Sequence, residues 1–324
     1  MEPHLLDTLD LKLLQALELD GRTPFSRIAQ VLGVSDQTVA RRFRRLRATA
    51  GLRVVGMVDE SRLGRTGWIV RLGCAHDAAP SLAAALARRP DTHYIDLVAG
   101  GAEVVCAIRP RSERERDELF LERIQRTPQV TSVTAHCVLH SYYGNTLGWL
   151  RKISALDAEE ELALRTASPA PSSAAVVLDA ADETMLTALA RDGRAPLTEL
   201  QTVTGQSEAS VARRLDRLRS TGVLYFAVEY DHVPLGRGVE ALCWLTVTPR
   251  DLVGAGRLVA GHPEVRFAGA VTGRTNLVVS VLCRTTADLY AFVGEKLAGL
   301  PGVVTAETTP TLRRVKTLTQ PSAG

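Results

Sequence analysis

The 324-residue sequence lacks any apolar run of the roughly 18 residues that a transmembrane helix needs. Its N-terminal stretch, Met1–Asp7, has no basic segment ahead of an apolar one, the pattern of a secretory signal. We therefore expect a cytoplasmic protein with no membrane contact. Cysteine is sparse: the five cysteines are widely spaced, form no Cys-x-x-Cys motif and cannot all pair within one chain. They are expected to be reduced and mostly buried thiols.

A strong excess of one charge is also missing, since 39 lysines and arginines face 36 acidic residues and leave a net charge of +3. A surplus this small does not by itself indicate a nucleic-acid-binding protein, so the positions of the charges must decide. Hydrophobic residues make up 45% and charged residues 23%, which excludes a disordered chain. The length is typical of several small domains.

The sequence repeats itself, a property to test before any helix or strand is assigned. Leu6 through Leu52 matches Leu178 through Leu224, so that Leu6 corresponds to the residue 172 positions later. Identical segments include Asp20-Gly21-Arg22 with Asp192-Gly193-Arg194, and Arg41-Arg42 with Arg213-Arg214. The match continues more weakly, through Pro90 with Pro263 and Pro128 with Pro301. The chain is thus a tandem duplication of a first and a second repeat, with a linker-like stretch at Ser168–Ser173.

The first part of each repeat has the pattern of a helix-turn-helix. In the first repeat, Asp7 is expected to cap a helix with Asp10 completing a capping box. A short helix over Phe25–Leu32 is predicted to end at Gly33, and Ser35 to cap a third helix that runs to about Thr49. The following residues, Leu52–Val58, alternate with β-branched content and can form a wing or a linking strand.

The remainder of each repeat predicts a βαββαβ order, which is the ferredoxin-like pattern. In the first repeat the expected elements are Trp68–Cys74, Pro80–Arg89, His93–Val98, Glu103–Ile108, Glu113–Gln125 and Val130–His140. The second repeat has strands near Leu242–Val247, Val265–Val271, Leu277–Leu282 and Val303–Thr311. The expected fold class is α+β, with two copies of a winged-type helix-turn-helix followed by a ferredoxin-like domain.

Positive charge gathers on the third helix of each repeat, the helix that a helix-turn-helix places in the major groove of double-stranded DNA. Short polar side chains occupy its first turn, where they can reach base edges, and arginines follow one turn later. The predicted DNA contacts are Ser35, Asp36, Gln37, Thr38, Arg41, Arg42, Arg44 and Arg45, and Ser207, Glu208, Ser210, Arg213, Arg214 and Arg217. The alternative is a solvated helix face laced with salt bridges. The helix of the second repeat is less basic, with Asp216 among its arginines, so the two need not read the same half-site.

The pattern Asp10-x-x-x-Leu14-x-x-Leu17-x-x-Asp20-Gly21-Arg22, the turn Gly33-Val34-Ser35 and the helix Val39-x-x-Arg42-x-x-x-Leu46 resemble the Lrp/AsnC family of bacterial transcription regulators. The resemblance covers nearly the whole chain, twice. It implies that the ferredoxin-like (RAM) domains pair with one another, bind an amino acid or related small effector, and assemble the chain into homo-oligomers. The implied domains are a helix-turn-helix over 1–60, a RAM domain over 61–150, a linker over 151–177, a second helix-turn-helix over 178–232 and a second RAM domain over 233–324.

The family's effector site includes a glycine-containing turn between the second and third strands of the RAM domain. By this resemblance the effector-binding residues are Gly100, Gly101 and Glu103, and Thr272, Gly273, Arg274 and Asn276. Glycine amides can bind a carboxylate, Glu103 can hold an ammonium group, and Arg274 can grip a carboxylate. The alternative is a hairpin turn that needs glycine for its geometry alone.

No Walker A loop, dinucleotide fingerprint, nucleophile elbow or zinc-protease motif is present, so we expect no enzyme, no catalytic residue, no metal and no cofactor. His136 and His140 lie on one expected strand, where residues four apart are separated by about 13 Å, too far to share a metal. Two other functions stay open. One is a tetrapyrrole enzyme, since the same architecture resembles sirohaem decarboxylases. The other is an interaction module that no longer binds DNA.

Overall fold

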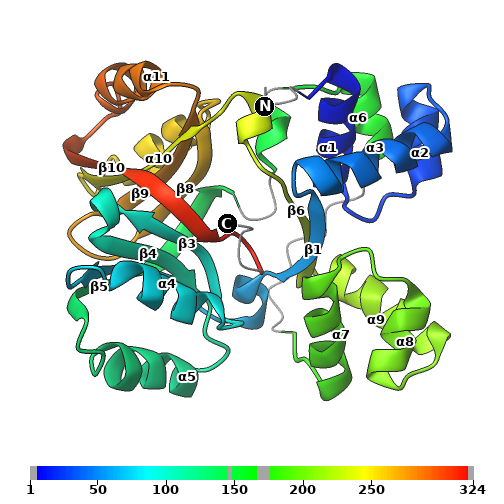
Figure 1. Ribbon diagram of the computed structural model, residues 1–324, viewed down its shortest axis with the longest axis horizontal. Helices are drawn as coiled ribbons and strands as arrows, with labels where there is room; N and C mark the ends of the chain where they lie inside the picture. Colours follow the sequence, from blue (N-terminus) through cyan, green and yellow to red (C-terminus); the bar gives the residue numbers. More distant parts are fainter. Residues whose placement is uncertain (1–5, 145–147, 153, 166–175, 320–324) are drawn as a thin grey trace. The chain divides into compact units, whose positions relative to one another are not determined.

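The computed structural model describes residues 6–144, 148–152, 154–165 and 176–319. These residues form two compact units, and each unit combines both repeats. The helical unit takes its residues from 1–64 and 145–236, and the barrel unit from 65–144 and 237–324 (Figure 1). The linker-like stretch Ser168–Ser173 lies outside the described residues.

The helical unit contains two three-helix domains. Its helices are α1 (Thr8–Leu19), α2 (Phe25–Leu32), α3 (Asp36–Thr49), α7 (Ala180–Arg191), α8 (Leu197–Thr204) and α9 (Glu208–Ser220). The predicted capping box is confirmed, because Asp7 and Asp10 each accept a hydrogen bond from the other's backbone N–H. The predicted bounds of α2 and α3 are also confirmed, and Gly33 ends α2 in the left-handed conformation (φ 66°) that glycine adopts without strain. A further helix, α6 (Ala158–Leu164), packs on α2.

One strand from each repeat joins the two helix-turn-helix domains. β1 (Arg53–Val58) pairs antiparallel with β6 (Leu224–Glu229) in a two-stranded sheet, and the two lie side by side in Figure 1. Among the described residues neither strand pairs with a second strand of its own repeat, so of the two alternatives, a wing or a linking strand, the structure has the linking strand. The segment after β1 explains this, because the chain enters a 3-10 turn over Glu60–Leu63 and does not make the tight turn of a hairpin.

The barrel unit has the predicted βαββαβ order in both repeats. The first repeat supplies β2 (Trp68–Cys74), α4 (Ala79–Ala87), β3 (Thr92–Val98), β4 (Glu103–Ile108), α5 (Glu113–Asp117) and β5 (Val130–Tyr143). The second supplies β7 (Val239–Val247), α10 (Leu252–Ala260), β8 (Val265–Val271), β9 (Leu277–Cys283), α11 (Thr286–Ala291) and β10 (Val303–Lys316). Helices α5 and α11 each continue into a π-helical segment, Glu118–Ile124 and Phe292–Leu297.

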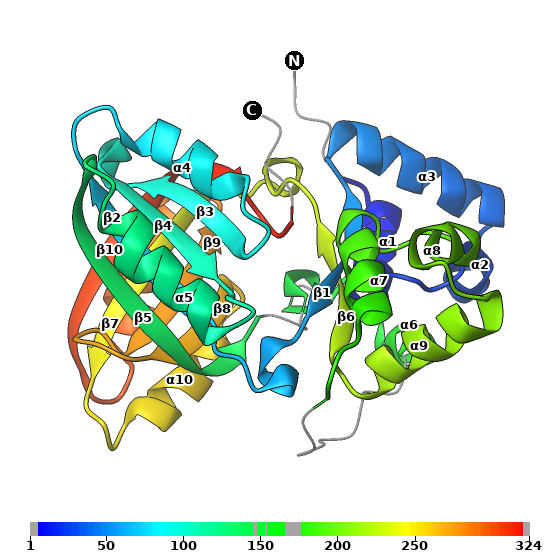
Figure 2. The same ribbon diagram turned by 90° about the horizontal axis from the view of Figure 1, so that it is seen from below.

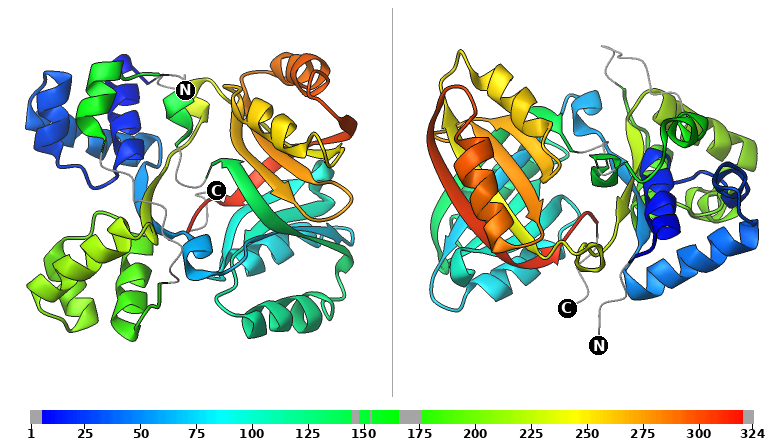
Figure 3. Two further views of the ribbon diagram at one scale, coloured as in Figure 1. Left: turned by 180° about the vertical axis from the view of Figure 1, so that it is seen from behind. Right: turned by 90° about the horizontal axis from the view of Figure 1, so that it is seen from above.

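The eight strands close into one barrel in the order β10-β3-β4-β2-β5-β8-β9-β7. Strand β5 pairs first with β2 and then, from Val138 onward, with β8 of the other repeat. Strand β10 does the same with β7 and, from Thr311 onward, with β3. Both strands therefore extend beyond their predicted ends at His140 and Thr311, because the extra residues find their partners only in the other repeat. Helices α4 and α5 lie on the outside of the barrel (Figure 2). Helices α10 and α11 also lie on the outside, as the two views of Figure 3 show. Figure 2 shows the first repeat's strands beneath their helices.

Apolar side chains fill both faces of the sheets. Each repeat's strands pack against their own helices, as Leu72 and Ile95 do in the first repeat and Leu245 and Val279 in the second. A separate cluster, built on Trp244, joins the two repeats inside the barrel. All five cysteines are free thiols, and three of them are buried. Among the described residues, none of the helices combines the length and the apolar character needed to cross a bilayer.

Candidate functional site

Helix α3 presents one exposed stripe to solvent. Val39 and Leu46 are buried in the helix-turn-helix core. At 100° per residue, Gln37, Arg41 and Arg44 lie on the opposite face, and all three are exposed. The helix therefore offers a polar, basic surface in the position that a recognition helix uses.

The first turn of each recognition helix is organised by a serine. The Ser35 hydroxyl accepts a hydrogen bond from the Thr38 N–H (3.2 Å), and Ser207 accepts one from the Ser210 N–H (3.4 Å). Both serines are N-caps, so they begin the helix that carries the other predicted contacts. Asp36 follows at an exposed position in α3 and Glu208 at the equivalent position in α9.

Two of the predicted arginines in each repeat bind within their own domain. Arg42 donates to Asp7 (2.6 Å) and to Asp10 (2.9 Å), and Arg45 also donates to Asp10, whose side chain is 1% exposed. In the second repeat Arg214 binds Asp179 and Asp182 in the same way, and Arg217 binds Asp182. These pairs hold the recognition helix against the first helix of its domain. Arg41 and Arg213, in contrast, are exposed.

The repeated triplet Asp20-Gly21-Arg22 has a role that the sequence reasoning missed. Arg22 donates to the carbonyl oxygens of Gly193 (2.7 Å) and Ala195 (3.0 Å), in the equivalent loop of the other repeat. Arg194 returns the contact, donating to Gly21 (2.6 Å) and Thr23 (3.1 Å). The guanidinium of Arg194 also lies 4.5 Å from the ring centroid of Phe25. The two domains are thus clamped together reciprocally, and the identity of the triplet in both repeats was the available signal.

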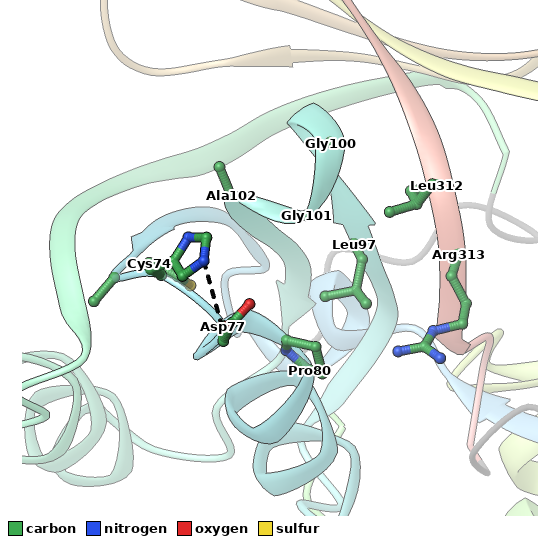
Figure 4. Close-up of a pocket in the computed structure, with 11 residues that line it drawn as sticks. Cys74, Asp77, Pro80, Leu97, Gly100, Gly101, Ala102, Leu312 and Arg313 are labelled. Carbon is green, nitrogen blue, oxygen red and sulfur yellow. Dashed lines mark ion pairs between the residues drawn. The ribbon is translucent and has the colours of Figure 1, made fainter.

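The glycine turn of the first repeat borders a cavity of about 630 Å³. Gly100 (φ 66°) and Gly101 (φ 91°) line it, together with residues of the β2–α4 loop and of β10 (Figure 4). The ionisable side chains along its wall are those of Arg313 and of the exposed residues His76 and Asp77, which lie 3.4 Å apart. An open cavity with a guanidinium and a glycine turn has the features of a site for a small anionic ligand.

Glu103 does not line this cavity. Its carboxylate accepts two hydrogen bonds from Nη2 of Arg71 (2.9 and 3.2 Å), which also binds Glu307 (2.7 Å). The Arg71 guanidinium lies 4.7 Å from the ring centroid of Trp244, the residue at the equivalent position of the second repeat. The structure therefore brings Gly100 and Gly101 to the cavity and pairs Glu103 with Arg71 of the neighbouring strand, which itself contacts the second repeat.

In the second repeat the corresponding turn is occupied by hydrogen bonds to neighbouring strands. Both side-chain amide atoms of Asn276 bind the backbone of Val247 (2.8 Å each). The Thr272 hydroxyl accepts from the Cys137 N–H (2.9 Å), and its carbonyl accepts from Nδ1 of His136 (2.6 Å). Gly273 has φ 112°, a conformation that favours glycine. The side chains of Thr272 and Asn276 are therefore engaged by backbone groups of the protein, while the side chain of Arg274 is exposed beside them.

A second ionic cluster ties the repeats together within the barrel. Arg314 on β10 binds Asp96 on β3 (2.7 Å) and Glu240 on β7 (2.7 Å), and Arg266 on β8 also binds Glu240 (2.9 Å). Asp96 is 2% exposed, and burial raises its pKa although Arg314 acts in the opposite direction. The two arginines and two carboxylates balance in charge, and they join four strands from both repeats.

The histidines of the expected strand lie in different surroundings. The His136 ring packs against Trp244 (5.3 Å between centroids), whereas the His140 ring packs against Tyr142 (4.7 Å). Within the part of the chain that the structure describes, no three histidine, cysteine or acidic side chains come together as a metal-binding group. Burial raises the pKa of the Cys106 and Cys243 thiols to about 12, which leaves them without nucleophilic thiolate at neutral pH.

Comparison with known families and proteins agrees with this architecture. A model of the AsnC-type helix-turn-helix domain matches residues 6–47 and 178–219, and a model of the Lrp/AsnC ligand binding domain matches residues 240–321. The HTH-type transcriptional regulator FL11 of Pyrococcus horikoshii is 28% identical over 45% of this chain and 96% of its own length. The leucine-responsive regulatory protein of Rhizobium meliloti is 30% identical over 44% of this chain and 93% of its own length. Each relative thus corresponds in length to about one repeat.

Among solved structures, the siroheme decarboxylase NirDL is similar over 97% of this chain and 94% of its own, with a TM-score of 0.64. The sequence identity is 14%, so the similarity concerns the fold alone.

Proposed function

Because the chain belongs to the Lrp/AsnC family of transcriptional regulators, with two helix-turn-helix domains and a ligand-binding domain, we propose that it binds specific double-stranded DNA under the control of a small effector. The exposed basic stripe of α3 carries this proposal. The clamp of Arg22 and Arg194 supports it, since it joins the two helix-turn-helix domains by reciprocal hydrogen bonds. We place the DNA-binding parts at 1–60 and 178–232, the RAM parts at 61–150 and 233–324, and the connection at 151–177. Action on DNA would place the protein in the cytoplasm.

For the effector we propose an amino acid or a related small carboxylate, bound in the cavity beside Gly100 and Gly101. Arg313 would pair with the carboxylate, and Asp77 would face the ammonium group. An effector held between α4's loop and β10 touches both repeats, so it would act by favouring one arrangement of the barrel unit. Homo-oligomers formed through the RAM domains would add further DNA-binding units.

The test of DNA binding is fluorescence anisotropy of the full chain on duplexes that tile the DNA upstream of its own coding sequence, at several salt concentrations. We expect tight binding to a subset of duplexes, weakening steeply as salt rises. Equal binding to every duplex would contradict sequence specificity, and no binding at low salt would contradict the regulator function.

The test of the effector site is calorimetry with a panel of amino acids. At least one should release or absorb heat with the native chain and lose affinity by about tenfold in Arg313→Ala, the effect of removing a charge-assisted pair. Arg274→Ala, at the turn of the second repeat, is the matched control and should leave the affinity unchanged. A loss of affinity in Arg274→Ala but not in Arg313→Ala would place the effector site at the turn of the second repeat.

We propose no catalytic activity for this chain. The similarity to the siroheme decarboxylase concerns the fold, and the exposed arginines of α3 have a function in a DNA-binding protein that they lack in a tetrapyrrole enzyme. An iron porphyrin added to the purified chain should show the absorbance spectrum of the free compound, and a shifted Soret band at one porphyrin per chain would overturn this proposal.

A further inference from the structure

The two recognition helices differ on the face that would meet DNA. The exposed stripe of α3 contains Gln37, Arg41 and Arg44. The equivalent stripe of α9 contains Ala209, Arg213 and Asp216, which are exposed as well. Arg44 of the first repeat is therefore replaced by Asp216 in the second. Gln37, whose amide can read a base, is replaced by Ala209, which has only a methyl group.

The arginines on the flanks increase this difference. Arg219 of α9 binds Asp20 of the first repeat (2.7 Å), so its charge is already paired. Its counterpart Arg47 is exposed, and its side chain has no ion pair or hydrogen bond with another described residue.

When the arginines that are paired within the protein are left out of the count, the net charges of α3 and α9 are very different. In both repeats the arginines that bind Asp10 or Asp182 are partly neutralised, which affects the helices equally. On α3 the three remaining arginines, Arg41, Arg44 and Arg47, face only Asp36, a net +2. On α9 the one remaining arginine, Arg213, faces Glu208 and Asp216, a net −1.

We propose that α3 is the DNA-reading helix of each chain and that α9 is a scaffold that holds α3 in place. Affinity for duplex DNA depends chiefly on cations that neutralise phosphates, and on α9 the one remaining arginine is outweighed by two carboxylates. The second repeat retains its domain for another purpose: Arg194 stacks on Phe25 of the first repeat, and Arg219 binds Asp20 at the C-terminal end of α1. Each chain then supplies one half-site reader, and an operator with two half-sites requires two chains.

This inference rests on the proposed DNA binding, and it is tested with matched variants of the full chain. Arg41→Ala and Arg213→Ala remove equivalent exposed arginines, and Arg44→Asp and Asp216→Arg exchange the charge at the position where the helices differ. Each is measured by anisotropy on a duplex that the native chain binds, at several salt concentrations. All four side chains are exposed, so thermal unfolding should be nearly unchanged and serves as the folding control.

We expect Arg41→Ala to lower affinity by about tenfold and to reduce the slope of log K against log salt by about 0.9, the loss of one phosphate contact. Arg213→Ala should change affinity by less than about twofold and leave the slope unaltered. Arg44→Asp should abolish most binding, whereas Asp216→Arg, on the scaffold helix, should leave the affinity and the slope nearly unchanged. Equal losses in Arg41→Ala and Arg213→Ala would overturn the single-reader inference while leaving DNA binding intact. A native chain without salt-dependent binding would instead refute the proposed function and this inference with it.

Discussion

The two repeats have kept some interactions identical and have made others complementary. Within each helix-turn-helix the acidic capping box and its two arginine partners recur residue for residue, as the pairs of Arg42 and Arg214 show. Inside the barrel, where the repeats face each other, equivalent positions differ: Arg71 corresponds to Trp244, Asp96 to Gly269 and Glu103 to Asn276.

The location of each interaction explains this contrast. Contacts inside one domain are unaffected by duplication, so a working set of residues can be retained in both repeats. A contact across a symmetric dimer must be self-complementary, and duplication within one chain removes that requirement. Arg71 can then stack on Trp244, whereas two arginines at this position would repel each other.

The largest expected effect comes from breaking a complementary contact. Arg314→Ala leaves Asp96 buried without its main cationic partner, which should lower the free energy of unfolding by about 3–5 kcal/mol. The equivalent residue of the first repeat is Ser141, and Ser141→Ala should cost about 1 kcal/mol or less. Urea denaturation followed by circular dichroism measures both values, and similar losses would show that the barrel is not asymmetric in its energetics.

Because the capping boxes and their arginine partners are the same in both repeats, removing them should lower the free energy of unfolding by the same amount in each. Asp10→Ala and Asp182→Ala each remove a capping box and a buried acceptor for two arginines, at an expected cost of about 2–3 kcal/mol. The two losses should agree within about 0.5 kcal/mol and add in the double variant, because the sites are separate. Clearly unequal losses would mean that the two helix-turn-helix domains differ in their internal packing.

The free energy of unfolding should depend on pH through Glu18, whereas the equivalent residue of the second repeat, Ala190, has no side chain that titrates. Burial raises the pKa of Glu18 to about 7, even though its carboxylate accepts hydrogen bonds from Tyr230 (2.7 Å) and the Leu150 N–H (2.9 Å). The unfolded chain releases this proton near its usual value of about 4.3, so between these pH values the native state binds more protons and loses stability as pH rises.

The predicted contribution of Glu18 is a fall in the free energy of unfolding of about 2 kcal/mol from pH 5 to pH 7. Glu18→Gln should remove that component, which denaturation of both proteins at several pH values would reveal as a smaller slope. Parallel pH profiles for the native and variant chains would indicate that the carboxyl group titrates normally.

The smallest predicted difference lies between the two glycine turns. Gly100→Ala places a Cβ in open space at φ 66° and should cost about 1 kcal/mol. Gly273→Ala should cost about 1 kcal/mol more, because its Cβ would lie 2.9 Å from Nδ1 of His136. Thermal unfolding in a His136→Ala background provides the control, since the extra cost should disappear there.

Local signals explain what could be predicted. The duplication, the bounds of α2 and α3, the capping box and the βαββαβ order follow from periodicity, caps and glycines that act over a few residues. The predicted ends of β5 and β10 were too early because the remaining residues pair with strands more than a hundred positions away. The role of the Asp20-Gly21-Arg22 triplet was missed for the same reason, since its partners lie in the other repeat.

The sequence by itself determined that the chain has two Lrp/AsnC-type repeats and where the recognition helix of the first repeat begins and ends. It did not determine which of the arginines on those helices are available to a ligand, nor that Glu103 is already bound by Arg71. Only the tertiary structure decided these points. A charged side chain is free or paired according to the groups within a few ångströms of it, and in this protein those groups come from another helix, from a neighbouring strand or from the other repeat.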